Sequence, residues 1–183
     1  MKKSLKIMLA SAAAMLALAG CKSIPTPEAM KATSTAVGAA AGLVANETKI
    51  DDKARNAVIE IVGKVSSVTP DKGQTFEDAW TPVAKEVVAK LIAEGKLDDG
   101  TGQLALMAFG IAVKGIDYIF DIRYPKAREY EELVAAAIKG FTEGFLSTFT
   151  PANGDAVRAT IPSPAPDEEA LKWLREKAAA VKK

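Results

Sequence analysis

The sequence predicts an all-α fold, a single bundle of five to six helices, and three observations support this class. Apolar residues recur every three or four positions in several separate segments, which is the spacing of one helix face. Thr, Asp or Pro residues stand at the start of these segments, where they favour a helix N-terminus. Period-two alternation, which is typical of a strand, is found only weakly, at 154–161. We therefore expect little or no sheet.

Composition divides the chain into five parts. Residues 1–20 form a removable N-terminal segment, 21–26 a short tether, and 27–150 the helical bundle. Residues 151–166 read as an extended linker rich in proline, and 167–183 as an amphipathic C-terminal helix. The 163 residues that follow position 20 are enough for one domain with a substantial core and few for two.

The first helix of the bundle is predicted from Pro27 to about Asn46. Thr26 precedes it as an N-cap, and Pro27 suits the first helical position, where its missing N–H would have no partner in any case. Gly38 and Gly42 stand four residues apart, and small residues at this spacing allow a second helix to approach closely. The segment is too polar to span a membrane, so we expect a tight helix contact inside a bundle.

Two further amphipathic helices are predicted before the centre of the chain. Asp51 caps a helix over 52–68, whose apolar residues form one stripe. Residues 75–78 resemble a capping box, with Asp in place of the usual Glu, ahead of a helix that ends near Glu94. Pro82 lies inside this helix, so a kink or a later start is expected there.

Residues 104–122 are the most apolar stretch after the N-terminal segment, and they predict a central helix. A helix that is hydrophobic nearly all round lies either in the middle of a bundle or within a membrane. Lys114, Asp117 and Asp121 interrupt the stretch, and the cost of charge in lipid favours the bundle. Lys114 and Asp117 are three residues apart and are expected to pair.

A further helix is predicted to start at Pro125 and to run to about residue 149. Its apolar stripe carries three phenylalanines, with Gly140 and Gly144 beside them. This arrangement predicts a groove of small residues, flanked by aromatic ridges, that packs against a neighbouring helix.

The three phenylalanines of this stripe, Phe141, Phe145 and Phe149, support two interpretations. Aromatic residues at helical spacing are usually part of the core, which is the interpretation we favour. The alternative is that they bind an apolar ligand in a cavity between the helices over 104–122 and 126–149.

The C-terminal helix also leaves two possibilities open. Asp167 caps it, and the stiff segment over 162–166 separates it from the bundle. The helix either docks on the bundle or projects as an arm. A projecting arm is the preferred hypothesis, with Trp173 and Leu174 as its anchors on a partner, because aromatic residues dominate small interfaces.

Composition excludes several kinds of site. The chain has no histidine and a single cysteine, Cys21, so histidine-based triads and the usual zinc sites are excluded. The acidic loop over 97–102 lacks the spacing of an EF-hand, so it is expected to cap a helix rather than to bind calcium. After residue 20 the chain carries 21 Lys and Arg against 23 Asp and Glu, which gives no electrostatic footprint for nucleic acid.

No catalytic residue, metal ligand or cofactor is expected. The carboxylate pairs Glu131 with Glu132 and Asp117 with Asp121 are the only ones that suggest acid–base chemistry, and neither has a diagnostic spacing. The sequence therefore predicts a protein that is not an enzyme.

The N-terminal 21 residues carry the strongest motif. Three lysines within the first six residues precede an unbroken run of apolar and small residues over 7–19, and the sequence Leu-Ala-Gly-Cys closes it. This is the layout of a secretory signal peptide, and the run is shorter than the about 20 residues of a membrane span. The closing tetrapeptide resembles the lipobox of bacterial lipoproteins. This resemblance implies cleavage between Gly20 and Cys21 and acylation of Cys21, palmitate included.

The resemblance also implies a location. A lipid on Cys21 would anchor the protein to a membrane of the bacterial cell envelope. Lys22 follows the acylated residue, at the position where retention in the inner membrane commonly uses Asp. We therefore expect the outer membrane, with the protein facing the periplasm.

The expected function is that of a binding or structural module for an envelope protein or the cell wall. The chain ends in Lys182 and Lys183, and its terminal lysine resembles that of the major outer-membrane lipoprotein, which is joined to peptidoglycan. Peptidoglycan is therefore one expected partner, and no nucleic acid is. The alternatives are the apolar ligand described above and perturbation of a membrane by residues 104–122.

Overall fold

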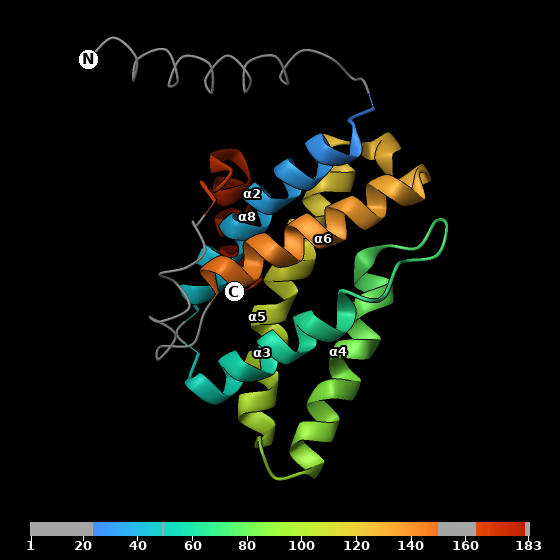
Figure 1. Cartoon of the computed structure of the whole chain (residues 1–183). Coiled ribbons are helices and arrows are strands. Elements are labelled where there is room, and N and C mark those ends of the chain that lie inside the picture. Colours follow the sequence, from blue (N-terminus) through green and yellow to red (C-terminus); the bar gives the residue numbers. More distant parts are fainter. Residues whose placement is uncertain (1–23, 49, 150–163, 182–183) are drawn as a thin grey trace, which may run out of the picture.

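The computed structural model describes residues 24–48, 50–149 and 164–181, which form an all-α bundle (Figure 1). No strand occurs in this part of the chain, which confirms the predicted fold class. A short π-helix and a short 3₁₀-helix follow the central helix. The α-helices are α2 (Pro27–Asn46), α3 (Asp52–Val65), α4 (Phe76–Ala93), α5 (Asp99–Tyr118), α6 (Glu131–Thr148) and α8 (Glu168–Val181), and the two short elements are η1 (Ile119–Arg123) and η2 (Pro125–Glu129).

Helix α5 is the centre of the bundle. It passes between a group formed by α2, α6 and α8 and a second group formed by α3 and α4 (Figure 1). Because it contacts all five of these helices, it is buried on nearly every side, and Ile116 is completely buried. The prediction of a central helix is confirmed. Among the described residues, no helix combines the length and the apolar character needed to cross a membrane.

The closest packing in the bundle joins α2 to α6. Gly140 lies against Lys31 and Gly144 against Thr35, while Gly38 lies against the backbone of Phe141. Residues later in α2 therefore contact residues later in α6, so the two helices run parallel. The glycines of both helices face each other, which confirms that the small residues of each segment mark a tight helix contact.

Side-chain caps begin most helices, as the sequence predicts. In each case an oxygen of the cap residue accepts a hydrogen bond from the backbone N–H three residues later, which satisfies one of the unpaired donors of the first turn. At Thr75 the hydroxyl also donates to the carboxylate of Asp78, so this cap closes through its side chains. The caps, with their N···O distances, are Thr26 (3.2 Å), Asp51 (2.7 Å), Thr75 (3.0 Å), Asp98 (2.9 Å) and Asp167 (3.0 Å).

The prediction of one continuous helix from Pro125 to residue 149 is wrong. After the 3₁₀-helix η2 the backbone is extended at Tyr130, and α6 begins only at Glu131. The break shifts the helical register, so Tyr130 leaves the buried stripe and is 38% exposed. Two acidic residues, Glu131 and Glu132, occupy the first turn of α6, where they interact favourably with the positive end of the helix.

Helix α8 docks on the bundle, so the hypothesis of a projecting arm is wrong. Its apolar stripe faces α2 and α5, and Leu174 is only 1% exposed. The N–H of Asp167 donates to the carbonyl of Ala36 on α2, at 3.1 Å. Arg175, eight residues later, pairs with Glu47 at 2.6 Å, so α8 lies parallel to α2. The helix therefore belongs to the same core as the segment over 27–150.

Candidate functional site

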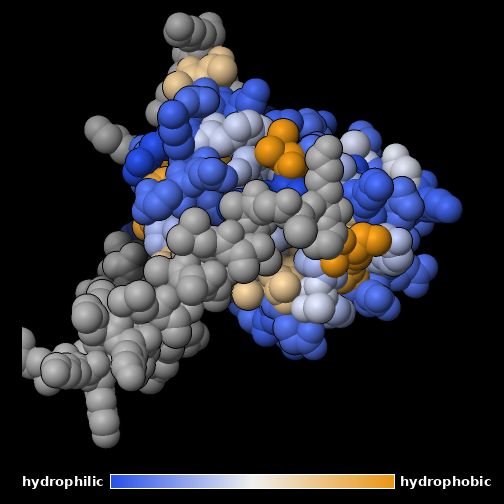
Figure 2. Space-filling model, turned by 90° about the horizontal axis from the view of Figure 1, so that it is seen from above, coloured by the Kyte–Doolittle hydropathy of each residue, from blue (hydrophilic) through white to orange (hydrophobic). Residues whose placement is uncertain are grey.

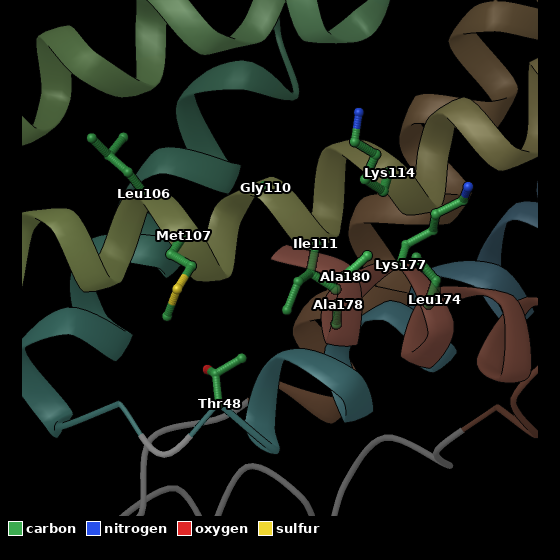
Figure 3. Close-up of a pocket in the computed structure, with 10 residues that line it drawn as sticks. All are labelled: Thr48, Leu106, Met107, Gly110, Ile111, Lys114, Leu174, Lys177, Ala178 and Ala180. Atoms are coloured by element: carbon green, nitrogen blue, oxygen red, sulfur yellow. The ribbon is translucent and has the colours of Figure 1, made fainter. Parts of the chain in front are cut away.

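A groove between α5 and α8 is the most distinctive apolar hollow of the described structure. It lies near the C-terminal end of α2 and has a volume of about 380 Å³, within the range of about 300–1,000 Å³ that is typical of small-molecule sites (Figure 3). Among the described residues, its lining comes from α5, α8 and one residue after α2. Its lining consists of Thr48, Leu106, Met107, Gly110, Ile111, Lys114, Leu174, Lys177, Ala178 and Ala180.

The geometry of α5 and α8 explains why a groove forms here. The rings of Tyr118 on α5 and Trp173 on α8 contact each other at an angle of 49°, with centroids 5.2 Å apart, and this contact holds the two helices together at one level. Farther along, Gly110 on α5 and Ala178 on α8 both line the hollow. Small residues on both helices cannot fill the space between them. Their antiparallel pairing therefore leaves an apolar hollow beyond the aromatic contact.

The rim of the groove on the α5 side is apolar and exposed. Met107 is 38% exposed and Leu104, one helical turn earlier, is 40% exposed. Large apolar side chains that stay accessible beside a hollow favour a binding surface, since they gain most from being covered. Methionine also adapts its shape to different partners because its side chain is unbranched and flexible.

Two lysines lie on the opposite side of the hollow from Leu106 and Met107 (Figure 3). The Lys114 ammonium group forms an ion pair with Glu77 of α4 at 2.8 Å, and this partner raises the pKa of Lys114. The Lys177 ammonium group lies 5.4 Å from the centre of the Trp173 ring. None of the described lining residues carries a carboxylate. The two charged side chains of this lining are therefore both positive.

Gly110 is the position where the groove can be altered without disturbing the fold. A methyl group placed on its Cα would meet no atom within 4 Å. The residue lines the groove from the middle of α5, with a backbone that any residue can adopt. A larger side chain at Gly110 therefore extends toward the hollow rather than into the core.

A charged cluster lies behind Lys114, at the end of α5. Asp117 is only 8% exposed, and Arg128 of η2 approaches its carboxylate at 3.6 Å and that of Asp121 at 3.0 Å. The expected pairing of Lys114 with Asp117 is wrong, since Lys114 pairs with Glu77 instead. Burial, together with the negative charge of Asp121 nearby, raises the pKa of Asp117 to about 6, against the opposing influence of Arg128 and Lys114.

The raised pKa of Asp117 predicts how stability depends on pH. Below about pH 4 the carboxyl is protonated in both the folded and the unfolded chain, so it does not lower the free energy of unfolding. Between about pH 4 and 6 the unfolded chain loses its proton first, so the folded state becomes less stable as the pH rises. We expect Asp117→Asn to raise the free energy of unfolding by about 1–2 kcal/mol at pH 7.5 and to leave it unchanged near pH 4. The value at pH 7.5 is reduced to account for solvent screening.

Urea unfolding of both proteins at several pH values measures this difference. Glu86→Gln is the matched control, because Glu86 is an exposed carboxylate on α4 that takes no part in the Asp117 cluster. An equal gain for Asp117→Asn at pH 4 and pH 7.5 would contradict the assignment.

The predicted ligand-binding phenylalanines do not line the groove. Phe141, Phe145 and Phe149 are buried and stack along α6, with centroid distances of 6.1 and 5.0 Å between successive rings. A second hollow, of about 500 Å³ beside Arg128, does not include them either. In the described part of the chain they are core residues, which is the interpretation of the apolar stripe that the sequence favours.

The other predicted site residues are dispersed. Trp173 packs on Tyr118, and Leu174 is buried where it closes the floor of the groove. Gly20, Cys21, Lys182 and Lys183 lie outside the described residues, as does the linker up to residue 163. The sequence shows α5 only as an apolar helix, so it does not predict which of its residues line a groove. The small residues at Gly110 and Ala178 are the signal that was available.

Outside the groove, the described surface visible from above in Figure 2 is mainly hydrophilic. Hydrophobic side chains form small, separate spots on this face. Single exposed apolar residues are normal on a folded protein and do not indicate a partner. The groove is therefore a better candidate for binding than this face.

Comparison of the chain with family models, with curated proteins and with solved structures gives no match.

Proposed function

We propose that the protein is a lipid-anchored module of the bacterial cell envelope that binds an apolar small molecule and has no enzymatic activity. The observation that carries the binding role is the groove of about 380 Å³ between α5 and α8, with its apolar lining and exposed rim. The anchor rests on the likeness of residues 18–21 to a lipobox. An outer-membrane position facing the periplasm is part of the same proposal.

The groove supports a small ligand better than a protein or peptidoglycan partner. Those partners were expected to bind a projecting C-terminal arm, but α8 is packed against α2 and α5. Leu174, one of the expected anchors, is buried. A hollow lined by small and apolar side chains offers little hydrogen bonding and much apolar area, which suits a hydrophobic ligand.

The anchor is tested on the mature protein from a bacterial host. We expect mass spectrometry to find an N-terminus at Cys21 that carries acyl chains, since two or more chains hold a protein firmly to a membrane where one does not. Cys21→Ala should leave the membrane fraction. An unmodified Cys21, or an intact segment over 1–20, would contradict this part of the proposal.

The groove is tested by filling it at Gly110. In the mature chain with Cys21→Ala, we expect the uncharged dye N-phenyl-1-naphthylamine to bind with a saturable rise in fluorescence. Gly110→Leu should weaken this binding at least about tenfold, because the new side chain takes up the hollow. It should not lower the melting temperature, since leucine is a better helix former than glycine by about 0.8–1 kcal/mol.

Gly63→Leu is the matched control for the filled groove. Gly63 lies on the exposed side of α3, where an added methyl group also meets no atom within 4 Å. This variant should bind the dye like the parent protein. Equal dye binding by the Gly110 and Gly63 variants, or no binding by the parent, would overturn the proposed ligand site.

A further inference from the structure

We propose that the ligand of the groove is an anionic amphiphile with a single alkyl chain, such as a fatty acid. This inference rests on the proposed function and adds the chemical class of the ligand. Its basis is an apolar hollow with two lysines at one side and no acidic residue in its described lining.

The apolar part of the groove determines the shape of the ligand. Leu106, Met107 and Ile111 of α5 line the hollow together with Ala178 and Ala180 of α8. None of these side chains hydrogen-bonds, so a ligand that fills this space must itself be apolar there. The volume of about 380 Å³ is near the lower end of the range for small-molecule sites. This size suits one alkyl chain and not the two chains of a bilayer lipid.

The charges at the rim determine the head group. Within the described residues Lys177 forms no ion pair with a carboxylate, and its ammonium group contacts the face of the Trp173 ring. Lys114 is held by Glu77 at 2.8 Å, which fixes its position and keeps it charged. An anion at this rim would gain two positive neighbours and no negative one from the lining. A cationic head group would find no carboxylate among the described lining residues.

The position of Trp173 supports the same assignment. Its ring contacts Tyr118 of α5 on one side and lies near the Lys177 ammonium group on another. The aromatic contact therefore holds the lysine-bearing turn of α8 against α5, beside the end of the hollow. The rim charge is thus carried by a packed part of the helix and not by a free terminus.

The test compares three amphiphiles that share a ten-carbon chain: decanoate, decyl glucoside and decyltrimethylammonium. Each amphiphile is added, below its own critical micelle concentration, to the mature Cys21→Ala chain that has N-phenyl-1-naphthylamine bound. The displacement of the dye measures how tightly the amphiphile binds. We expect decanoate to bind at least about fivefold more tightly than decyl glucoside, and the cation to bind most weakly. Higher salt should reduce this preference, because the lysines are accessible to solvent.

Lys177→Gln should weaken decanoate binding about two- to fivefold, the range for one exposed ion pair, and leave decyl glucoside unchanged. The double variant with Lys114→Gln should remove the preference for the anion. Lys172→Gln is the matched control, because Lys172 is exposed on α8 and does not line the groove. It should bind all three amphiphiles like the parent protein.

The possible failures separate the two proposals. If the dye binds and Gly110→Leu blocks it, but the three amphiphiles bind equally, the groove remains a ligand site and the anionic class is wrong. If Lys177→Gln instead lowers sedimentation with phosphatidylglycerol vesicles, the lysines face a membrane surface and this inference is also wrong. If no amphiphile and no dye binds, both proposals fail.

Discussion

Gly144→Ala is expected to destabilise the protein by at least about 3 kcal/mol, through the addition of a single methyl group. The Cβ of alanine at this position would lie 2.0 Å from the carbonyl oxygen of Thr35 and 3.0 Å from the backbone nitrogen of Ala39. Both neighbours are backbone atoms of α2, which cannot rotate away as a side chain can. Helices α2 and α6 must therefore separate, or one of them must shift along the other.

Separation would also break the polar contacts that join the two helices. The Thr148 hydroxyl donates to the carbonyl of Ala39 at 3.0 Å, and the Asn46 amide donates to the carbonyl of Thr148 at 2.7 Å. The first of these bonds is buried, so its loss leaves an unpaired group away from water. The substitution therefore lowers the free energy of unfolding by more than the steric clash alone would.

Urea unfolding followed by circular dichroism measures the loss. Gly63→Ala is the matched control, because its added methyl group meets no atom within 4 Å. On an exposed helix this control should gain about 0.5–1 kcal/mol. A Gly144→Ala variant that is as stable as the parent would show that α2 and α6 do not pack through their glycines.

Much of this packing could be predicted from the sequence because its signals are local. The residues Thr26, Asp51 and Asp98 each precede a helix and cap it through a hydrogen bond three residues away. Glycines spaced four apart on α2 and on α6 indicated surfaces for close approach. The sequence did not show that these two surfaces meet each other, or that the helices run parallel, because their partners are about 100 residues apart.

The features that could not be predicted depend on tertiary neighbours. Lys114 has Asp117 three residues away, but Glu77 of α4 lies closer in space, and the ion pair forms there. The extended backbone at Tyr130 follows a 3₁₀-helix that no sequence period marks. The groove is a property of two helices together, so neither α5 nor α8 alone reveals it.

The docking of α8 links stability to the proposed binding site. Leu174 is buried against the bundle and also closes the floor of the groove. At the start of the helix, Arg123 of η1 pairs with Asp167, and in its middle Arg175 pairs with Glu47. The Arg175–Glu47 pair is exposed and contributes little, so most of the docking energy must come from the buried apolar residues.

Leu174→Ala should therefore cost about 2–5 kcal/mol, through lost burial and the cavity that it leaves. For a chain of this size the melting temperature should fall by about 5–15 °C, which differential scanning calorimetry measures. Dye binding should weaken as well, because the floor of the groove is lost. Glu176→Ala, at an exposed position two residues along the same helix, should change neither property. An unchanged melting temperature for Leu174→Ala would show that α8 adds nothing to the core, and the groove that it closes would then have no stable second wall.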